Sequence, residues 1–297
     1  MLFRSSSTLV QLQNQNNPLS EISYTRKISV LGLGGFSSSN TTLAARNINP
    51  SYYGRYDLVE TPEGQKIGLI HNLTIGSRIN DYDQIEVPYY PVLNGIIVPQ
   101  LTFLTNEQEL DKYITHANIE IDEEGKILNE MVPVRYQDYF VEISRKKVNY
   151  IDSSFYQMNS ITSSIIPFFH HNDATRMLMA SNMQRQAVTL LKNEPPLVSS
   201  GIEFGLLDSS SLTIKAEEEG EVEYANSQEI SIRSKNDKII KYKLKQSIIS
   251  NKNTLNFSIP SVKEGEKINQ GQIISHGNYG NGYELSLGYN LRVAYLC

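Results

Sequence analysis

Polar side chains at positions 176–186 offer the most chemistry in this sequence. Arg176 carries a planar guanidinium, and the segment Asn182-Met-Gln-Arg-Gln186 adds a second guanidinium and three carboxamides. Groups with such fixed fork or amide geometry suit phosphates and the polar edges of nucleotides. The pattern therefore indicates a ligand that carries phosphate groups.

The same residues lie in a stretch, 168–188, that is predicted to be helical. Asn172 and Asp173 suit an N-cap, and good helix formers follow from Arg176 to Ala180. One helix would then carry both guanidinium groups. The alternative for this composition alone is a half-buried helix whose polar face is merely solvated.

Three further motifs favour the functional interpretation of this helix. They occur in the order Asn16-Asn-Pro-Leu-Ser-Glu-Ile22 with Arg26-Lys-Ile-Ser-Val-Leu-Gly-Leu-Gly-Gly35, then Ser51-Tyr-Tyr-Gly-Arg-Tyr-Asp-Leu-Val-Glu-Thr-Pro-Glu-Gly-Gln-Lys-Ile-Gly-Leu-Ile70, and finally Leu285-Ser-Leu-Gly-Tyr-Asn-Leu-Arg-Val-Ala-Tyr295. Together with Asn182-Met-Gln-Arg-Gln-Ala-Val188 they resemble, in the same order, segments of the β subunit of DNA-directed RNA polymerase of bacterial or plastid type. The resemblance extends almost continuously over residues 5–295.

The resemblance implies an α+β fold that is multi-lobed and β-rich. Residues 1–80 would form the fork and the rifamycin-pocket segment, and residues 81–150 a small external lobe. Residues 151–297 would form the core helix and the start of a hybrid-binding β-barrel. On this view the chain corresponds to the central part of a longer subunit.

The resemblance also implies roles for particular residues. Arg176 would contact the substrate phosphates, and Glu63 would lie near the downstream fork. Four residues would bind nucleic acid: Gln11, Lys66, Arg185 and Gln186.

The family's rifamycin pocket corresponds here to Gln11, Asn14, Tyr24, Lys27 and Ser29. Three of these depart from the family, because Asn14 replaces Asp, Tyr24 replaces His and Lys27 replaces Arg. A further departure is Ser38 in place of Arg, which weakens one expected contact with a nucleic-acid backbone.

No catalytic residue and no metal site are predicted within the chain. Phosphodiester synthesis requires two metal ions held by carboxylates, and the sequence has no dense Asp cluster of that kind. The resemblance implies that the partner β′ subunit holds Mg²⁺, so the isolated chain is predicted to be inactive. The implied partners are β′, α, the remainder of β, a sigma factor, the DNA template and the RNA transcript. The alternative is a non-catalytic nucleic-acid-binding or subunit-interaction fragment from a decayed or split gene.

Composition excludes several classes of protein. The net charge of the 297 residues is −5, so any nucleic-acid contact must depend on local Lys and Arg. The single Cys, at the last position, allows neither a disulfide framework nor a thiolate metal site. The adjacent His170 and His171 point in different directions and have no third ligand at useful spacing. No apolar run reaches the length of a membrane span.

The residue usage bears on the source. The chain has 18 Tyr, no Trp and abundant Ile, Asn and Lys, which is typical of an AT-rich genome. The expected compartment is a plastid (apicoplast or chloroplast), with the cytoplasm of a bacterium as the alternative. The family has Trp directly after the position of Cys297, so a UGA codon read as Trp, a split gene and a partial sequence all stay open as explanations of that end.

Several local elements are also predicted. Strands are expected around a turn at Asn94-Gly95, a helix over 104–117 and a hairpin over 119–128. Alternating residues in 219–225, 229–234 and 239–245 predict three more strands. The lysines of the last strand form either the wet face of a sheet or a wall that faces a nucleic-acid backbone.

Overall fold

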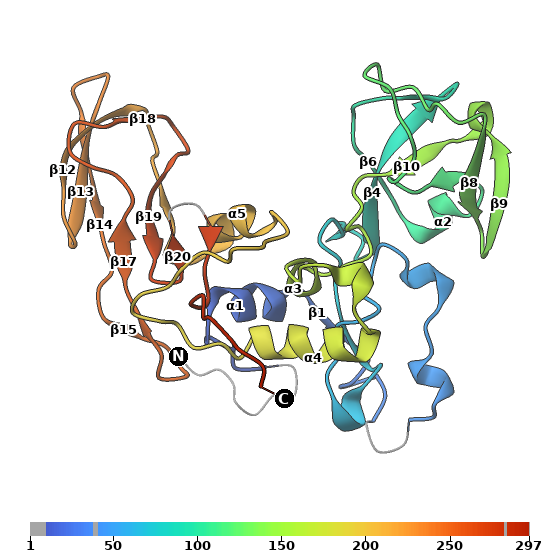
Figure 1. The fold of residues 1–297 in the computed structure, drawn as a ribbon, viewed down its shortest axis with the longest axis horizontal. Helices are drawn as coiled ribbons and strands as arrows, with labels where there is room; N and C mark the ends of the chain where they lie inside the picture. The colour runs from blue at the N-terminus through green and yellow to red at the C-terminus, as the bar shows by residue number, and fades with distance from the viewer. Residues whose placement is uncertain (1–9, 38–40, 282–283, 297) are drawn as a thin grey trace. The chain divides into compact units, whose positions relative to one another are not determined.

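The computed structural model describes residues 10–37, 41–281 and 284–296, and it is β-rich with short helices (Figure 1). The chain divides into two compact units. Unit 1 comprises Met1–Arg26 and Ile165–Cys297, and unit 2 comprises Lys27–Ser164. The sequence analysis expected three segments, 1–80, 81–150 and 151–297, whereas the structure divides into two units. The three-segment division stays a prediction. Ser38 lies outside the described residues.

Unit 2 is built on an eight-stranded sheet with the order β3-β4-β10-β7-β8-β9, in which β5 and β6 also pair with β4. Only the β10–β7 pair is parallel. Its core includes Val87, Tyr89, Val132 and Val134, all nearly fully buried. The strands are β3 (Arg78–Ile79), β4 (Ile85–Leu93), β5 (Ile96–Ile97), β6 (Thr102–Leu104), β7 (Ile114–Thr115), β8 (Met131–Tyr136), β9 (Tyr139–Ser144) and β10 (Tyr150–Asp152).

The turn predicted at Asn94-Gly95 is confirmed. Both residues have positive φ, 52° and 84°, as a two-residue hairpin between β4 and β5 requires. The helix predicted over 104–117 is wrong, because only α2 (Asn106–Glu109) is helical. Leu104 instead lies in β6 and Ile114 in β7, and both pack in the sheet core. The helix-like spacing of these apolar residues therefore came from two strands. The hairpin predicted over 119–128 is confirmed as a short one, since an antiparallel bridge joins Ile121 and Ile127 and the N–H of Leu128 donates to the carbonyl of Glu120 at 3.0 Å.

The remaining part of unit 2 consists of short elements. The strand β1 (Lys27–Ser29) pairs with β2 (Ile70–Asn72), and α3 (Ile161–Ser164) ends the unit. The 3-10 turns are η1 (Ala44–Arg46), η2 (Pro50–Tyr52), η3 (Gly64–Lys66) and η4 (Arg145–Lys147).

Unit 1 combines helices with small antiparallel sheets. The three predicted strands are confirmed as β12 (Gly220–Ala225), β13 (Glu229–Ser234) and β14 (Ile239–Lys243), in a sheet of order β14-β13-β12-β18. A second sheet has the order β11-β19-β17. The other strands of unit 1 are β11 (Ile214–Lys215), β15 (Ile248–Ile249), β16 (Leu255–Asn256), β17 (Ser258–Pro260), β18 (Lys267–Ile268), β19 (Ile273–Gly277), β20 (Gly280–Asn281) and β21 (Glu284–Leu285).

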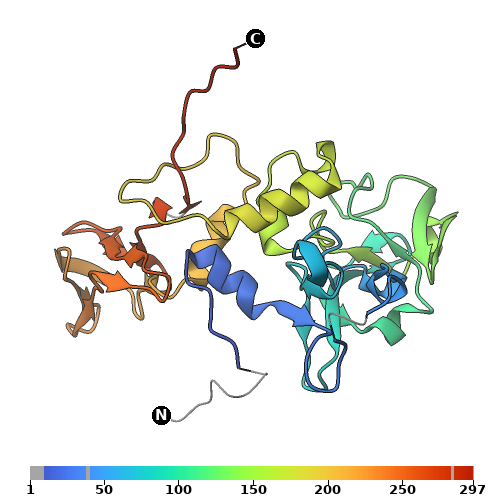
Figure 2. The ribbon, with the colours of Figure 1, turned by 90° about the horizontal axis from the view of Figure 1, so that it is seen from below.

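The two larger sheets of unit 1 share an apolar core that includes Val222, Ile230, Ile232 and Ile274. The sheets are open in the part of the chain that the structure describes, so the barrel stays a proposal. The helical elements are α1 (Pro18–Thr25), η5 (Phe169–His171), α4 (Ala174–Gln184), α5 (Glu203–Leu206) and η6 (Leu207–Ser209). Figure 2 shows α1 in blue and α4 in yellow-green.

Within the described ranges, no helix combines the length and the apolar character needed to cross a bilayer.

Candidate nucleic-acid interface

The helix α4 begins as the sequence predicts. Asp173 is its N-cap, and its Oδ2 accepts a hydrogen bond from the backbone N–H of Thr175 at 3.1 Å. Met177 and Ser181 face the interior, at 6% and 0% exposure, whereas Arg176 is exposed. The guanidinium of Arg176 lies 3.7 Å from the Sδ of Met179, so it stands on the outer face of the helix.

The helix ends earlier than predicted. Gln184 is its last residue, Arg185 is the C-cap, and the N–H of Gln186 donates to the carbonyl of Met183 at 2.9 Å. The prediction that one helix carries all the polar groups up to Gln186 is therefore wrong for Arg185 and Gln186, which lie beyond its last residue. Arg185 instead donates to the Oδ1 of Asn182, and Gln186 is exposed just beyond the helix.

The carbonyls at this end of the helix are bound by Asn17, which the sequence analysis did not single out. Its Nδ2 donates to the carbonyls of Gln184 at 3.0 Å and Ala187 at 2.8 Å. Helix C-terminal carbonyls lack partners within the helix, and a side-chain donor satisfies them. The Oδ1 of Asn17 accepts from the N–H of Ser20 at 2.8 Å, so the same side chain caps α1. Asn17 is 3% exposed.

This junction brings two of the predicted groups of residues together. The side chains of Asn16 and Asn17, just beyond Asn14, donate to backbone carbonyls of the segment 184–187, which carries Arg185 and Gln186. The turn at 250–254 joins them, since the Nδ2 of Asn251 donates to the carbonyl of Gln13 and the hydroxyl of Thr254 to that of Gln15. Three stretches that are distant in sequence therefore meet within unit 1.

Two of the predicted rifamycin-pocket residues contact each other. The hydroxyl of Tyr24 donates to the Oε1 of Gln11 at 2.8 Å. Asn14 is half-buried, and its Oδ1 accepts from the N–H of Asn16 at 3.3 Å. Lys27 and Ser29 lie in β1, which belongs to unit 2.

The two remaining predicted residues also belong to unit 2. Glu63 precedes η3 as its N-cap residue, and Lys66 ends it. Both are exposed at the tip of a loop. Unit 1 therefore holds Gln11, Asn14, Tyr24, Arg176, Arg185 and Gln186, and unit 2 holds Lys27, Ser29, Glu63 and Lys66.

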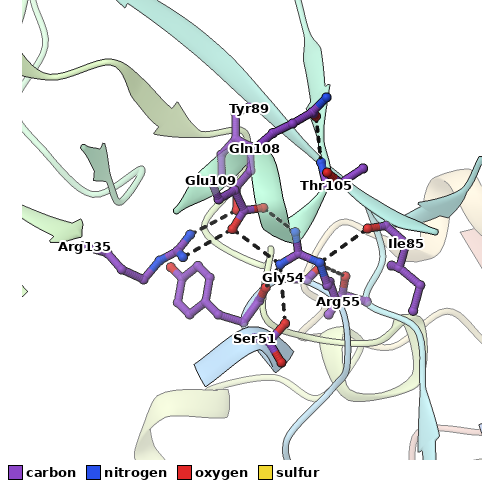
Figure 3. Close-up of polar contacts among 11 residues, drawn as sticks. Ser51, Gly54, Arg55, Ile85, Tyr89, Thr105, Gln108, Glu109 and Arg135 are labelled. Carbon is purple, nitrogen blue, oxygen red and sulfur yellow. Dashed lines mark hydrogen bonds and ion pairs between the residues drawn. The ribbon is translucent and has the colours of Figure 1, made fainter. Parts of the chain in front are cut away.

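A buried ionic network in unit 2 was missed by the sequence analysis. Figure 3 shows the carboxylate of Glu109, on α2, between the guanidinium groups of Arg55 and Arg135. The Arg55 Nη2 lies 2.5 Å from one carboxylate oxygen, and the Arg135 Nη1 lies 3.3 Å from the other. The only hint in the sequence was Arg55 in the Tyr-Gly-Arg motif, since Glu109 and Arg135 lie in stretches without a motif.

The network extends to a second carboxylate. The Arg135 guanidinium lies 4.3 Å from the centre of the Tyr53 ring, and the Tyr53 hydroxyl donates to the Oδ2 of Asp152 at 2.6 Å. Burial of Asp152 raises its pKa to about 6, although the Tyr53 hydrogen bond and the Arg135 charge oppose that shift. Its Oδ1 has no hydrogen-bond partner among the residues that the structure describes. The network therefore holds segment 51–56 against the sheet.

The described residues contain no group of three or more His, Cys, Asp or Glu side chains placed to hold a metal ion. The polar groups gathered in unit 1 are instead amides, hydroxyls and guanidiniums. Such groups donate to and accept from a polar ligand but do not ligate Mg²⁺ as a carboxylate cage does.

Comparisons with known proteins agree with the motifs. A profile described as RNA polymerase Rpb2, domain 3, matches residues 11–79, and one described as RNA polymerase beta subunit external 1 domain matches residues 89–154. The chain is 43% identical to the DNA-directed RNA polymerase subunit beta of Rhodomonas salina over 296 residues, which are 99% of the chain and 27% of that relative. Identity is 41% to the subunit beta of Trichodesmium erythraeum, over 99% of the chain and 27% of the relative, and 41% to that of Mesomycoplasma hyopneumoniae, over 99% and 24%.

The chain thus belongs to the family of the β subunits of DNA-directed RNA polymerases. It spans about a quarter of the length of the relatives that it matches.

Proposed function

We propose that the chain works as part of a DNA-dependent RNA polymerase, in which it helps to bind the incoming ribonucleoside triphosphate and the transcript. The observation that carries this proposal is the Asn17 junction, because it binds the backbone of the turn that carries Arg185 and Gln186, in the same unit as Gln11. Guanidinium and amide donors gathered in this way suit the phosphates of a nucleic-acid backbone. The names of the relatives support the same assignment.

In this proposal Arg176 binds the triphosphate, Gln11, Lys66, Arg185 and Gln186 bind the nucleic acid, and Glu63 lies at the fork. The residues of unit 1 from β11 onward begin the hybrid-binding barrel. The chain supplies no catalytic group, so Mg²⁺ and its chemistry belong to the β′ subunit. The other partners would be α, the remainder of β, a sigma factor, the DNA template and the RNA transcript.

We also propose a plastid as the compartment, on the basis of the AT-rich residue usage. Relatives of similar identity occur in bacteria and in an alga, so a bacterial cytoplasm is the alternative. The genome that carries the gene would decide between the two.

The test of the substrate role is Arg176→Ala in the complete enzyme. Loss of a charge-assisted contact costs about 1.5–3 kcal/mol, so the KM for nucleotides is expected to rise about tenfold or more, with assembly unchanged. Lys263→Ala, which removes an exposed charge in a turn of the same unit, is the matched control. Unchanged nucleotide kinetics in an assembled Arg176→Ala enzyme would remove Arg176 from the substrate site.

A further inference from the structure

Two buried carboxylates lie at the base of the loop 57–68 in unit 2. Asp57 and Glu60 are each 1% exposed, whereas Glu63 and Lys66 at the tip of the loop are exposed. A carboxylate is costly to bury unless hydrogen bonds compensate for the lost water. The donors around these two groups therefore define what holds the loop.

Four donors converge on the carboxylate of Asp57. Its Oδ1 accepts from the N–H groups of Val59 at 2.7 Å and Glu60 at 3.0 Å. Its Oδ2 accepts from the N–H of Ser160 at 2.7 Å and from the hydroxyl of Ser163. The hydroxyl of Ser160 donates to Glu60. Since Ser160 and Ser163 lie at α3, the start of the loop is fixed to a segment about a hundred residues away.

The end of the loop is fixed as well. The Nη1 of Arg46 donates to the carbonyls of Gln65 at 2.8 Å and Ile67 at 2.6 Å. Gly68 has φ +72°, and a Cβ there would lie 2.9 Å from the Cβ of Arg46, so the backbone passes close to this residue. The Thr61 hydroxyl accepts from the N–H of Gly68 at 2.9 Å and closes the loop at its neck. Apart from Leu58, the exposed residues of the loop are those of its tip, 63–67.

We infer that Asp57 is a positioning residue that holds the loop so that Glu63 and Lys66 face the nucleic acid. This inference rests on the proposed function, in which Glu63 lies at the fork and Lys66 contacts nucleic acid. Asp57 itself is 1% exposed, so it can act only through the tip. It follows that its effect should disappear when the tip side chains are absent.

The sharpest change is Asp57→Asn, which keeps the shape of the side chain. Each carboxylate oxygen accepts at least one backbone N–H, so the amide NH₂ of Asn faces an N–H donor in either orientation. The loop base then contains a clash of donors. Asp81→Asn, at an exposed aspartate of the same unit, is the matched control.

The experiment is a cycle in the complete enzyme with Asp57→Asn, the tip variant Glu63→Ala/Lys66→Ala, and their combination. The measurements are kcat/KM for nucleotide addition and the permanganate reactivity of unpaired thymines at the downstream edge of the DNA bubble. The tip variant is expected to lower kcat/KM roughly tenfold through lost charged contacts. Asp57→Asn should change both measurements in the same direction, and the combination should be no worse than the tip variant alone.

Three results would overturn the inference. If the combined variant lost kcat/KM by the product of the two separate losses, Asp57 would not act through the tip. A tip variant with reduced activity beside an unaffected Asp57→Asn enzyme would show that the loop needs no such anchor. A tip variant without effect would instead remove Glu63 and Lys66 from the proposed function, and the inference with it. If Asp57→Asn fails to assemble, Ser163→Ala replaces it in the cycle, since it removes one donor and leaves three.

Discussion

The hydrogen bond between Tyr24 and Gln11 bears on drug binding at the level of single residues. The resemblance places both side chains in the rifamycin pocket, and in this chain they engage each other at 2.8 Å. A drug that needs the Gln11 amide must compete with the Tyr24 hydroxyl. Asn14, in place of Asp, also lacks a charge and an acceptor.

We expect the complete enzyme to resist rifamycins. Each lost hydrogen bond to a buried ligand group costs about 1–3 kcal/mol, so two changes together cost about 2–6 kcal/mol and weaken binding at least about thirtyfold. Tyr24→His with Asn14→Asp should restore sensitivity, whereas the exposed neighbour change Thr25→Ala should not. The measurement is transcription across a rifampicin titration. Inhibition of the unmodified enzyme at the low concentrations that stop a sensitive enzyme would contradict this expectation.

Asp152 makes the stability of unit 2 depend on pH. Its folded-state pKa, raised to about 6, lies above its ordinary value of 3.8, so the folded chain binds the proton more tightly. The stability from this group is fully present below about pH 4 and is lost as the pH rises through 6.

We therefore expect wild type to gain up to about 3 kcal/mol relative to Asp152→Asn between pH 7 and pH 4, because the amide does not titrate. Unfolding temperatures of the two proteins across this range give the measurement. The exposed Asp81→Asn variant should show no such trend. A constant difference between wild type and Asp152→Asn would mean that Asp152 titrates normally.

At the scale of elements, the junction of α1 and α4 depends on one carboxamide. Asn17→Asp keeps the oxygen that caps α1 but turns a second oxygen toward the carbonyls of Gln184 and Ala187. A buried charge facing two acceptors is expected to destabilise unit 1 by about 3 kcal/mol.

The control for this junction is Asn16→Asp. The Nδ2 of Asn16 lies 3.5 Å from the carbonyl of Arg185, a weak contact in a half-buried place, so this change should cost much less. Denaturant midpoints of the two variants give the comparison. Equal midpoints would show that the Asn17 hydrogen bonds do not hold the helices together.

Elements with a strong local pattern were predictable from sequence. The N-cap of α4, the Asn94-Gly95 turn and the alternating strands β12, β13 and β14 all follow from nearest neighbours along the chain. The end of α4 and the short α2 were not predictable. Both involve partners far away in sequence, since Asn17 binds a carbonyl at the end of α4 and β7, within the span predicted to be helical, pairs with β10.

The candidate site divides in the same way. Arg176, Glu63 and Lys66 are exposed as a ligand-binding role requires, and their positions were found through motifs. The residues at the base of the loop that carries Glu63 and Lys66, such as Asp57 and Ser160, gave no signal, because a buried hydrogen bond between residues 103 positions apart leaves no periodic pattern.

For the whole molecule, we expect the isolated chain to synthesise no RNA on a DNA template, with or without Mg²⁺. The chain has no predicted catalytic residue, and its described part offers no carboxylate cage. RNA synthesis by the purified 297-residue chain would overturn the proposed division of roles with β′.

The same isolated chain should also aggregate. Large apolar side chains are widely exposed, among them Leu197 at 87%, Leu291 at 77% and Tyr295 at 94%. Exposed apolar surface of this kind marks contacts with other proteins or with further chain. Light scattering would detect the association, and a monodisperse monomer at high concentration would argue against it.

The discontinuity of unit 1 has a consequence for biosynthesis. The carbonyls that Asn17 binds lie 167 and 170 positions further along the chain, and all of unit 2 lies between. A ribosome therefore delivers the whole of unit 2 before it delivers the partners of α1. Since domains fold as units during synthesis, the N-terminal segment of unit 1 cannot form its contacts with α4 until unit 2 has been synthesised. Closing unit 1 is thus a contact of very high sequence separation, of the kind that is slow to form.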